Sequence, residues 1–216
     1  MAGAQSWSRV SLPATRAVRH SASARAGDAL GGLGPAADND RCDSVRFPSV
    51  SHLLIRDLQT GDSVDELTEI VHAAYQRLGA LGLNYTAVDQ GASVTRSRAD
   101  SGHCLVAEIE GRLIGTITWY GPGGGRGCDW YRRPKVARFG QLAVIPEHQG
   151  RGAGSRLIAE VERQSKEAGA TDLALDTAEP AVHLIDYYAR RGYVVVDHAR
   201  WAGKTYRSVI MSKALK

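Results

Sequence analysis

The sequence predicts a mixed α/β fold, in which an open sheet, antiparallel in its first part, carries helices on both faces. Three observations predict this class. Apolar residues from residue 52 onward repeat either at two-residue steps or at helical spacing. Two strand-like runs flank Glu110-Gly111, which is the pattern of a hairpin. Beyond residue 150, amphipathic segments alternate with short apolar runs. The predicted order is therefore β-α-α-β-β-β-α-β-α-β-β.

Local patterns define the first half of this order. "HLLIRDL" (52–58) predicts a strand, and residues 63–81 place apolar side chains on one face of an amphipathic helix. A second helix is expected within 86–100, although its apolar face is thin. "CLVAEIEGRLIGTITWY" then predicts a hairpin in which Gly111 supplies the turn.

The second half begins after residues 121–135, a segment too rich in Gly and Pro for regular structure. The elements expected beyond it are, in chain order, a strand over 136–146 ended by Pro146, a helix over 150–168 ended by Gly169, a strand over 172–177, a helix over 180–191, and strands in "GYVVVDH" and "TYRSVIMSKAL".

Residues 1–50 differ in composition from residues 51–216, which we assign to one domain. They are rich in Ala, Ser, Gly and Arg and contain no useful amphipathic repeat. A disordered tail, or an upstream start that precedes the real domain, is expected. A targeting peptide is the alternative, because residues 1–27 contain four arginines and no acidic residue.

Composition excludes several classes of function. The formal net charge of +4 is divided evenly between the first 50 residues and the rest, without the basic stripe of a nucleic-acid-binding protein. No apolar run reaches the roughly 18 residues that span a membrane. Cys42, Cys104 and Cys128 form no C-x-x-C pair and do not cluster with histidines, so neither a metal site nor a disulfide framework is expected. We expect a cytoplasmic protein.

"PEHQGRGAGSRL" (146–157) places three glycines between a strand and a helix. Free N–H groups and the helix dipole at such a junction favour an anion, so a phosphate site is expected rather than a linker. The P-loop pattern has no match. The dinucleotide pattern G-x-G-x-x-G is closer, with Asp172 or Asp176 about 20 residues further on. However, Ser155 stands at its third glycine position, and too few residues follow for a doubly wound fold.

"QGRGAG" (149–154) resembles the Q/R-x-x-G-x-G/A signature of the GNAT superfamily of acyl-CoA N-acyltransferases. "LAVIPEHQGRGAGSRLI" matches the strand–loop–helix context of that signature, and "YYARRGYV" (187–194) is similar to the later Y-x-x-x-G-[FY] segment. The resemblance implies a sheet that splays open after the signature strand, with acetyl-CoA as acyl donor. It implies that the pyrophosphate is bound by backbone amides of Gln149, Gly150, Arg151, Gly152, Ala153 and Gly154. It also implies that the pantetheine arm pairs with Leu142, Ala143 and Val144.

The resemblance further implies direct attack of an amine on the thioester. An amide of Leu142 or Ala143 is expected to stabilise the oxyanion. Tyr188, four residues before Gly192, is expected to protonate the CoA thiolate. The general base stays open, because Phe139, Gly140 and Gln141 occupy the strand where many relatives carry a glutamate. Glu108, Asp176 and a water chain through Gln141 are the candidates.

The acceptor pocket is expected from residues 82–100 and 119–135. In the second segment, the aromatic residues either line the pocket or pack against the sheet; they are Trp119, Tyr120, Trp130 and Tyr131. Arg132, Arg133 and Lys135 either attract an acidic acceptor or are simply solvated. The function expected is N-acetylation of a small amine or amino-acid-like compound, with no metal and with a homodimer possible. A protein lysine or N-terminal acetyltransferase and a non-catalytic acyl-CoA sensor are the alternatives.

Overall fold

The structure is a computed structural model that describes residues 52–125 and 127–216. The predictions made for residues 1–50, including those for the N-terminal arginines and Cys42, lie outside the described residues. Within the described ranges, no helix is both long and apolar enough to cross a membrane.

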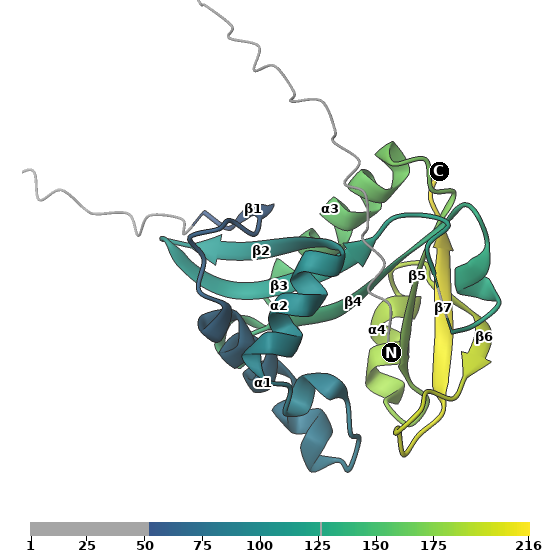
Figure 1. The fold of residues 1–216 in the computed structure, drawn as a ribbon, viewed down its shortest axis with the longest axis horizontal. Coiled ribbons are helices and arrows are strands. Elements are labelled where there is room, and N and C mark those ends of the chain that lie inside the picture. The colour runs from purple at the N-terminus through teal and green to yellow at the C-terminus, as the bar shows by residue number, and fades with distance from the viewer. Residues whose placement is uncertain (1–51, 126) are drawn as a thin grey trace, which may run out of the picture. The chain divides into compact units, whose positions relative to one another are not determined.

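Seven strands and four α-helices follow one another in the predicted order over the described residues (Figure 1). The strands are β1 (Leu54–Asp57), β2 (His103–Ile109), β3 (Arg112–Tyr120), β4 (Val136–Val144), β5 (Asp172–Ala178), β6 (Val194–Ala199) and β7 (Ser208–Ala214). The helices are α1 (Val64–Ala80), α2 (Ala92–Ser101), α3 (Ala153–Glu167) and α4 (Val182–Ala189).

Local capping explains the element boundaries that differ from the sequence-based ones. The Ser63 side chain accepts a hydrogen bond from the Glu66 N–H, which caps α1. The helix expected to begin at residue 150 begins only at Ala153, because Gly150 and Gly152 have φ angles of 73° and 92°. Such left-handed backbone cannot continue a right-handed helix.

The seven strands form one sheet in the order β1-β2-β3-β4-β5-β7-β6. All neighbours are antiparallel except β4 and β5, which are parallel. The predicted hairpin between β2 and β3 is confirmed, since Glu110 and Gly111 both have positive φ, as a two-residue type I′ turn requires. This mixed sheet is not the doubly wound sheet that the dinucleotide alternative would need.

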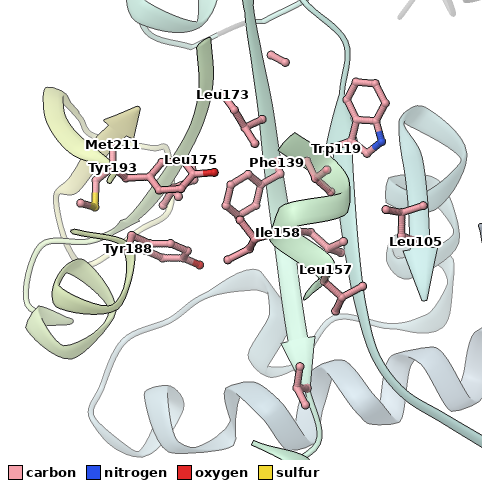
Figure 2. Packing of buried hydrophobic residues seen from close by; sticks show 14 of the residues in the cluster. Leu105, Trp119, Phe139, Leu157, Ile158, Leu173, Leu175, Tyr188, Tyr193 and Met211 are labelled. Atoms are coloured by element: carbon pink, nitrogen blue, oxygen red, sulfur yellow. The ribbon is translucent and has the colours of Figure 1, made fainter. Parts of the chain in front are cut away.

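The sheet carries helices on both faces, as predicted. Leu105 and Val106 are consecutive in β2, yet they belong to different buried clusters because successive side chains of a strand point to opposite faces. The cluster around Leu105 includes Leu157 and Ile158 of α3 and also Tyr188 of α4, and Figure 2 shows α3 crossing β4 within it. The cluster around Val106 includes apolar residues of α1 and α2.

The strands β4 and β5 separate after a short paired stretch. Their pairing covers only Val136–Arg138 against Asp172–Ala174, and beyond it the two strands diverge (Figure 1). A β-bulge lies just past this point: Thr118 of β3 pairs with Gly140, whereas Thr116 pairs with Ala143, so β4 carries one extra residue. The splayed sheet that the family resemblance implied is therefore present in the structure.

Candidate active site

After β4 the chain forms a short 3₁₀ turn over Pro146–His148. The glycine junction, residues 149–155, follows this turn and leads into α3. The first hydrogen bond of α3 runs from the Arg156 N–H to the Gly152 oxygen at 3.0 Å. Among the described residues, no acceptor pairs with the N–H groups of residues 150–155. Added Cβ atoms at Gly150 and Gly152 would meet no atom within 4 Å. The junction is therefore an open set of unpaired donors at the positive end of a helix dipole, which suits an anion.

Gln149 has a different position in this junction from its neighbours. Its N–H already donates to the Pro146 oxygen at 3.2 Å, and its side-chain amide donates to the Val144 oxygen at 2.8 Å. Gln149 therefore fixes the loop against the end of β4, and the free backbone donors are those that follow it.

Two residues of the helix α4 segment lie beside the junction, and the sequence did not predict their role there. A Cβ added at Gly154 would stand 3.0 Å from the Tyr187 hydroxyl oxygen, so a side chain here would require the Tyr187 side chain to shift by a few tenths of an ångström. The Arg191 guanidinium stacks on the Tyr187 ring at 3.5 Å and donates to the Ser155 hydroxyl. A cation therefore lies against the first turn of α3. The only signal in the sequence was the arginine pair before Gly192.

The amides of β4 beyond the bulge alternate between its two edges. The Ile145 N–H donates to the Ile114 oxygen at 2.9 Å, toward β3. Because the backbone groups of successive strand residues point to opposite edges, the Ala143 amide also faces β3. The amides of Leu142 and Val144 then face the divergence of β4 and β5. Of the two oxyanion donors expected from the sequence, Leu142 has this orientation and Ala143 does not.

Tyr188 lies between α4 and β4, with its hydroxyl directed toward β4 (Figure 2). Its ring packs edge-on against the rings of Phe139 and Tyr193, with centroids 6.0 Å apart in both cases. The hydroxyl has no hydrogen-bond partner among the described residues, and it is not among their fully enclosed polar atoms. Burial raises the pKa of Tyr188 well above its ordinary value, so the phenol stays protonated at neutral pH.

Asp176 lies on β5, on the other side of the divergence from Leu142. Its carboxylate accepts hydrogen bonds from the Trp201 indole N–H at 2.9 Å and the Tyr131 hydroxyl at 3.2 Å. The side chain is exposed to solvent, yet desolvation by surrounding protein raises its pKa. The hydrogen bonds from Trp201 and Tyr131 and the charge of Arg138 partly offset this rise in pKa.

The other candidate bases have different surroundings. Glu108 accepts a hydrogen bond from Arg56 at 2.8 Å and pairs across β1 with Leu54, two strands away from β4. This ion pair holds Glu108 at the β1 side of the sheet, away from the divergence of β4 and β5. Gln141 is buried at the bulge with φ of 54°, and its side-chain oxygen lies 3.5 Å from an Arg98 nitrogen. Asp176 is thus the one carboxylate among the three candidates that lies by the divergence.

Of the two alternatives for the aromatic residues, packing against the sheet describes Trp119 and Tyr131. Trp119 is 1% exposed in the core on the α3 face, where its indole N–H donates to Gln164 at 2.9 Å. Tyr120 points to the opposite face because the two residues are consecutive in β3. Tyr131 is also buried, and the Arg133 guanidinium lies over the Trp130 ring, 4.2 Å from the ring centroid. These aromatics pack with arginines and the sheet and do not form a continuous wall.

The basic residues of the same loop are solvated, which was one of the two alternatives for them. Arg132, Arg133 and Lys135 are exposed, and Arg132 pairs with the exposed Asp129. Cys104 and Cys128 are buried free thiols, and burial raises the pKa of each. Neither thiol is placed to act as a nucleophile, because the thiolate is the reactive form.

Comparison with known proteins gives the same picture. The model of the acetyltransferase (GNAT) family matches residues 64–193, more than half of the chain. Two enzymes of Bacillus subtilis (strain 168) are similar in sequence. S-alkylcysteine N-acetyltransferase is 29% identical over 145 residues, which cover 64% of this chain and 77% of that enzyme. S-(2-succino)cysteine N-acetyltransferase is 27% identical over 157 residues, which cover 70% and 90%.

Solved structures share the fold at lower identity. A GNAT family acetyltransferase from Brucella melitensis in complex with acetyl-CoA has a TM-score of 0.53 and 22% identity, covering 77% of this chain and 90% of that one. PH1933 from Pyrococcus horikoshii OT3 has a TM-score of 0.60 and 18% identity, covering 76% and 99%. The chain studied here is therefore an acyltransferase that belongs to the acetyltransferase (GNAT) family.

Proposed function

We propose that the enzyme transfers the acetyl group of acetyl-CoA to the amino group of a small amino-acid-like acceptor, in the class of S-substituted cysteines. One observation carries this proposal: Leu142 and Asp176 lie on β4 and β5 just beyond their last paired residues, and the Tyr188 hydroxyl is directed toward β4. The acceptor class is supported by the two similar Bacillus enzymes, both named for cysteine derivatives.

The glycine junction suits the pyrophosphate of acetyl-CoA. The N–H groups of Gly150, Arg151, Gly152, Ala153 and Gly154 have no acceptor within the described residues. Each charge-assisted hydrogen bond contributes about 1.5–3 kcal/mol. The helix dipole adds about 0.3–2 kcal/mol. Three or four such bonds reach the roughly 8 kcal/mol of a micromolar complex without a lysine.

The pantetheine arm is expected to pair with β4 beyond the bulge. In this arrangement it accepts a hydrogen bond from the Val144 N–H. The Val144 oxygen is already taken by the Gln149 side chain at 2.8 Å, so this residue offers a donor but not an acceptor. The Leu142 N–H would then lie beside the thioester oxygen and stabilise the negative charge that develops on it.

The chemical step forms an N–C bond as the acceptor amine attacks the thioester carbon, and the C–S bond breaks as CoA leaves as a thiolate. Tyr188 donates its phenolic proton to that thiolate. The ammonium form of the acceptor must lose a proton before it attacks, which for an alkylamine of pKa about 10.4 costs about 4.6 kcal/mol at pH 7. Its nitrogen loses a second proton as the amide forms, and this proton balances the one that Tyr188 gives to the thiolate. Asp176 is the residue that we assign to accept this proton, directly or through a water.

A protein acceptor is less consistent with the contacts around residue 84, which lies between α1 and α2. The Asn84 side chain donates to the Gly203 oxygen at 2.8 Å and accepts from the Thr205 N–H at 3.0 Å. The Lys204 ammonium donates to the backbone oxygen of Asn84 at 2.6 Å. These bonds tie the α1–α2 connection to the β6–β7 connection, which favours a bounded pocket over an open groove for a polypeptide.

Release of free CoA thiol from acetyl-CoA tests the proposal. The acceptors are S-methylcysteine, a lysine-containing peptide, a peptide with a free N-terminus, and a polyamine. We expect the fastest release with S-methylcysteine. Faster release with either peptide would favour the protein acetyltransferase. Tight acetyl-CoA binding without thiol release from any acceptor would favour the acyl-CoA sensor and contradict the proposal.

A further inference from the structure

Two arginines near the divergence of β4 and β5 form no salt bridge with a described residue. Arg138, on β4, lies with its guanidinium 3.8 Å from the Tyr120 ring centroid and 5.8 Å from that of Tyr131. Its Nε is fully enclosed and has no hydrogen-bond partner. The terminal nitrogens of Arg138 are not among the enclosed atoms, so they, and not Nε, are the donors that a ligand with an acceptor group could reach.

Arg98, on α2, approaches the same part of β4 from the helix side. It is half-buried, and its one described side-chain contact is the long 3.5 Å hydrogen bond to Gln141. Neither Arg98 nor Arg138 forms a salt bridge within the described residues. Each guanidinium has five N–H donors, and most of these donors remain available.

The space next to Gly140 is open. Gly140 stands on β4 between Arg138 and Gln141, and a Cβ built on it would meet no atom within 4 Å. This glycine does not have positive φ, so its backbone conformation does not require glycine. A small residue here leaves room for a ligand above the strand, beside the divergence where the Leu142 amide is free.

We propose that Arg98 and Arg138 bind the carboxylate of the acceptor above Gly140, and that the enzyme therefore selects amines that carry a carboxylate. The proposal rests on the proposed function and adds to it the part of the acceptor that is recognised. A planar guanidinium matches a carboxylate with two parallel hydrogen bonds, which a neutral side chain cannot do.

The neighbouring charges favour this assignment over an uncharged or a cationic acceptor. Lys204 is the third cation in the region. Desolvation is the main cause that lowers its pKa, and the positive charge of the nearby Arg98 lowers the pKa further. Lys204 already donates to the Asn84 oxygen and to the Thr86 hydroxyl, so it is less available to a ligand. Asp176 is the acidic group near Arg138, and its two oxygens are bound by neutral donors. Asp89 is a second acidic group near Lys204, so two carboxylates stand beside three cations, and an acidic acceptor offsets the remaining positive charge.

The test compares S-methylcysteine with 2-(methylthio)ethylamine, which is the same molecule without its carboxylate. In the unaltered enzyme we expect kcat/KM to be at least about 10-fold higher for S-methylcysteine, as one charged hydrogen-bonded pair is worth. Arg138→Gln and Arg98→Gln should each raise KM for S-methylcysteine and reduce this ratio by about 10-fold or more. Arg138→Lys should restore part of the ratio, since it keeps the charge without the planar fork.

Arg132→Gln is the matched control, because Arg132 is an exposed arginine of the nearby loop that pairs with Asp129. It should leave the ratio unchanged. Equal kcat/KM for the two amines in the unaltered enzyme would overturn the carboxylate subsite while the proposed acetyl transfer still stands. So would a ratio that persists in both Gln variants.

A second readout does not depend on turnover. Binding of N-acetyl-S-methylcysteine in the presence of CoA is measured by calorimetry for the unaltered enzyme and the three Gln variants. Binding weakened by about 10-fold in Arg98→Gln and Arg138→Gln, but kept in Arg132→Gln, supports the subsite even if no acceptor releases CoA. Equal affinity in all four proteins contradicts it. Circular dichroism of each variant separates loss of binding from loss of folding.

Discussion

The glycine junction and the region around Asp176 lie on either side of one strand divergence, but they are built from different parts of the chain. The junction, residues 149–155, is one continuous segment, and its chemistry comes from backbone N–H groups. The Asp176 region combines side chains from β3, β4, β5 and two loops. The first region depends on backbone conformation, and the second on which distant side chains meet. Substitutions should therefore act in opposite ways in the two regions: added side chains damage the junction, whereas removed side chains damage the Asp176 region.

The largest effect is expected from Tyr188→Phe. Loss of the phenolic proton should lower kcat by about 100-fold or more, the usual contribution of a general acid. The affinity for acetyl-CoA should stay nearly the same, because the ring still packs against Phe139 and Tyr193. Steady-state kinetics and calorimetric titration measure the two quantities. An unaltered kcat would remove Tyr188 from the mechanism.

The pH dependence should identify Asp176 as the base. A raised pKa means that the folded protein holds this proton to higher pH than a free aspartate does. Activity that needs the carboxylate should therefore rise with pH through a value above the ordinary 3.8. Asp176→Asn should abolish this acidic limb and lower kcat by about 100-fold. An acidic limb that persists in the variant would assign it to another group. The alkaline limb should not fall within the ordinary tyrosine range, because the pKa of Tyr188 is raised.

At the junction, Gly152→Val should weaken acetyl-CoA binding by about 10-fold or more. A β-branched residue is strongly disfavoured at φ of 92°, and the left-handed conformation costs about 1–2 kcal/mol for L-residues. Relaxation of this strain would turn the free N–H groups away from the ligand. The Kd from calorimetry measures the effect, and Gly61→Val, in the open turn before α1, is the control. Similar affinities in both variants would contradict a backbone-built site.

The smallest effect is expected when a side chain of the junction is removed. Arg151 is exposed and forms no salt bridge with a described residue, so Arg151→Ala should change the Kd for acetyl-CoA by less than about fivefold. A larger loss would mean that the Arg151 side chain itself binds phosphate. The glycine junction would then bind acetyl-CoA through a side chain as well as through its backbone N–H groups.

The elements predicted well were those whose signals are local. The turn at Glu110-Gly111 and the interruption between β4 and α3 are encoded within a few residues, because turn and helix-end conformations depend on glycine and on neighbouring backbone groups. The resemblance to the family, with a tyrosine four residues before Gly192, singled out Tyr188. The two alternatives for Trp119 could have been separated from the sequence, since consecutive residues of a strand cannot line the same pocket.

The sequence by itself determined the order of elements, the phosphate-type junction and the family. The order of elements follows from periodicity, the junction from backbone chemistry within a short segment, and the family from the resemblance of that segment to a known signature. The tertiary structure alone decided that β4 bulges at Gln141, which directs the Leu142 amide outward. It also decided that Glu108 is held by Arg56, and that Arg98, Arg138 and Asp176 lie around the same divergence. The physical reason is that strand register and the pairing of distant segments depend on packing of the whole sheet, which no short stretch of sequence specifies.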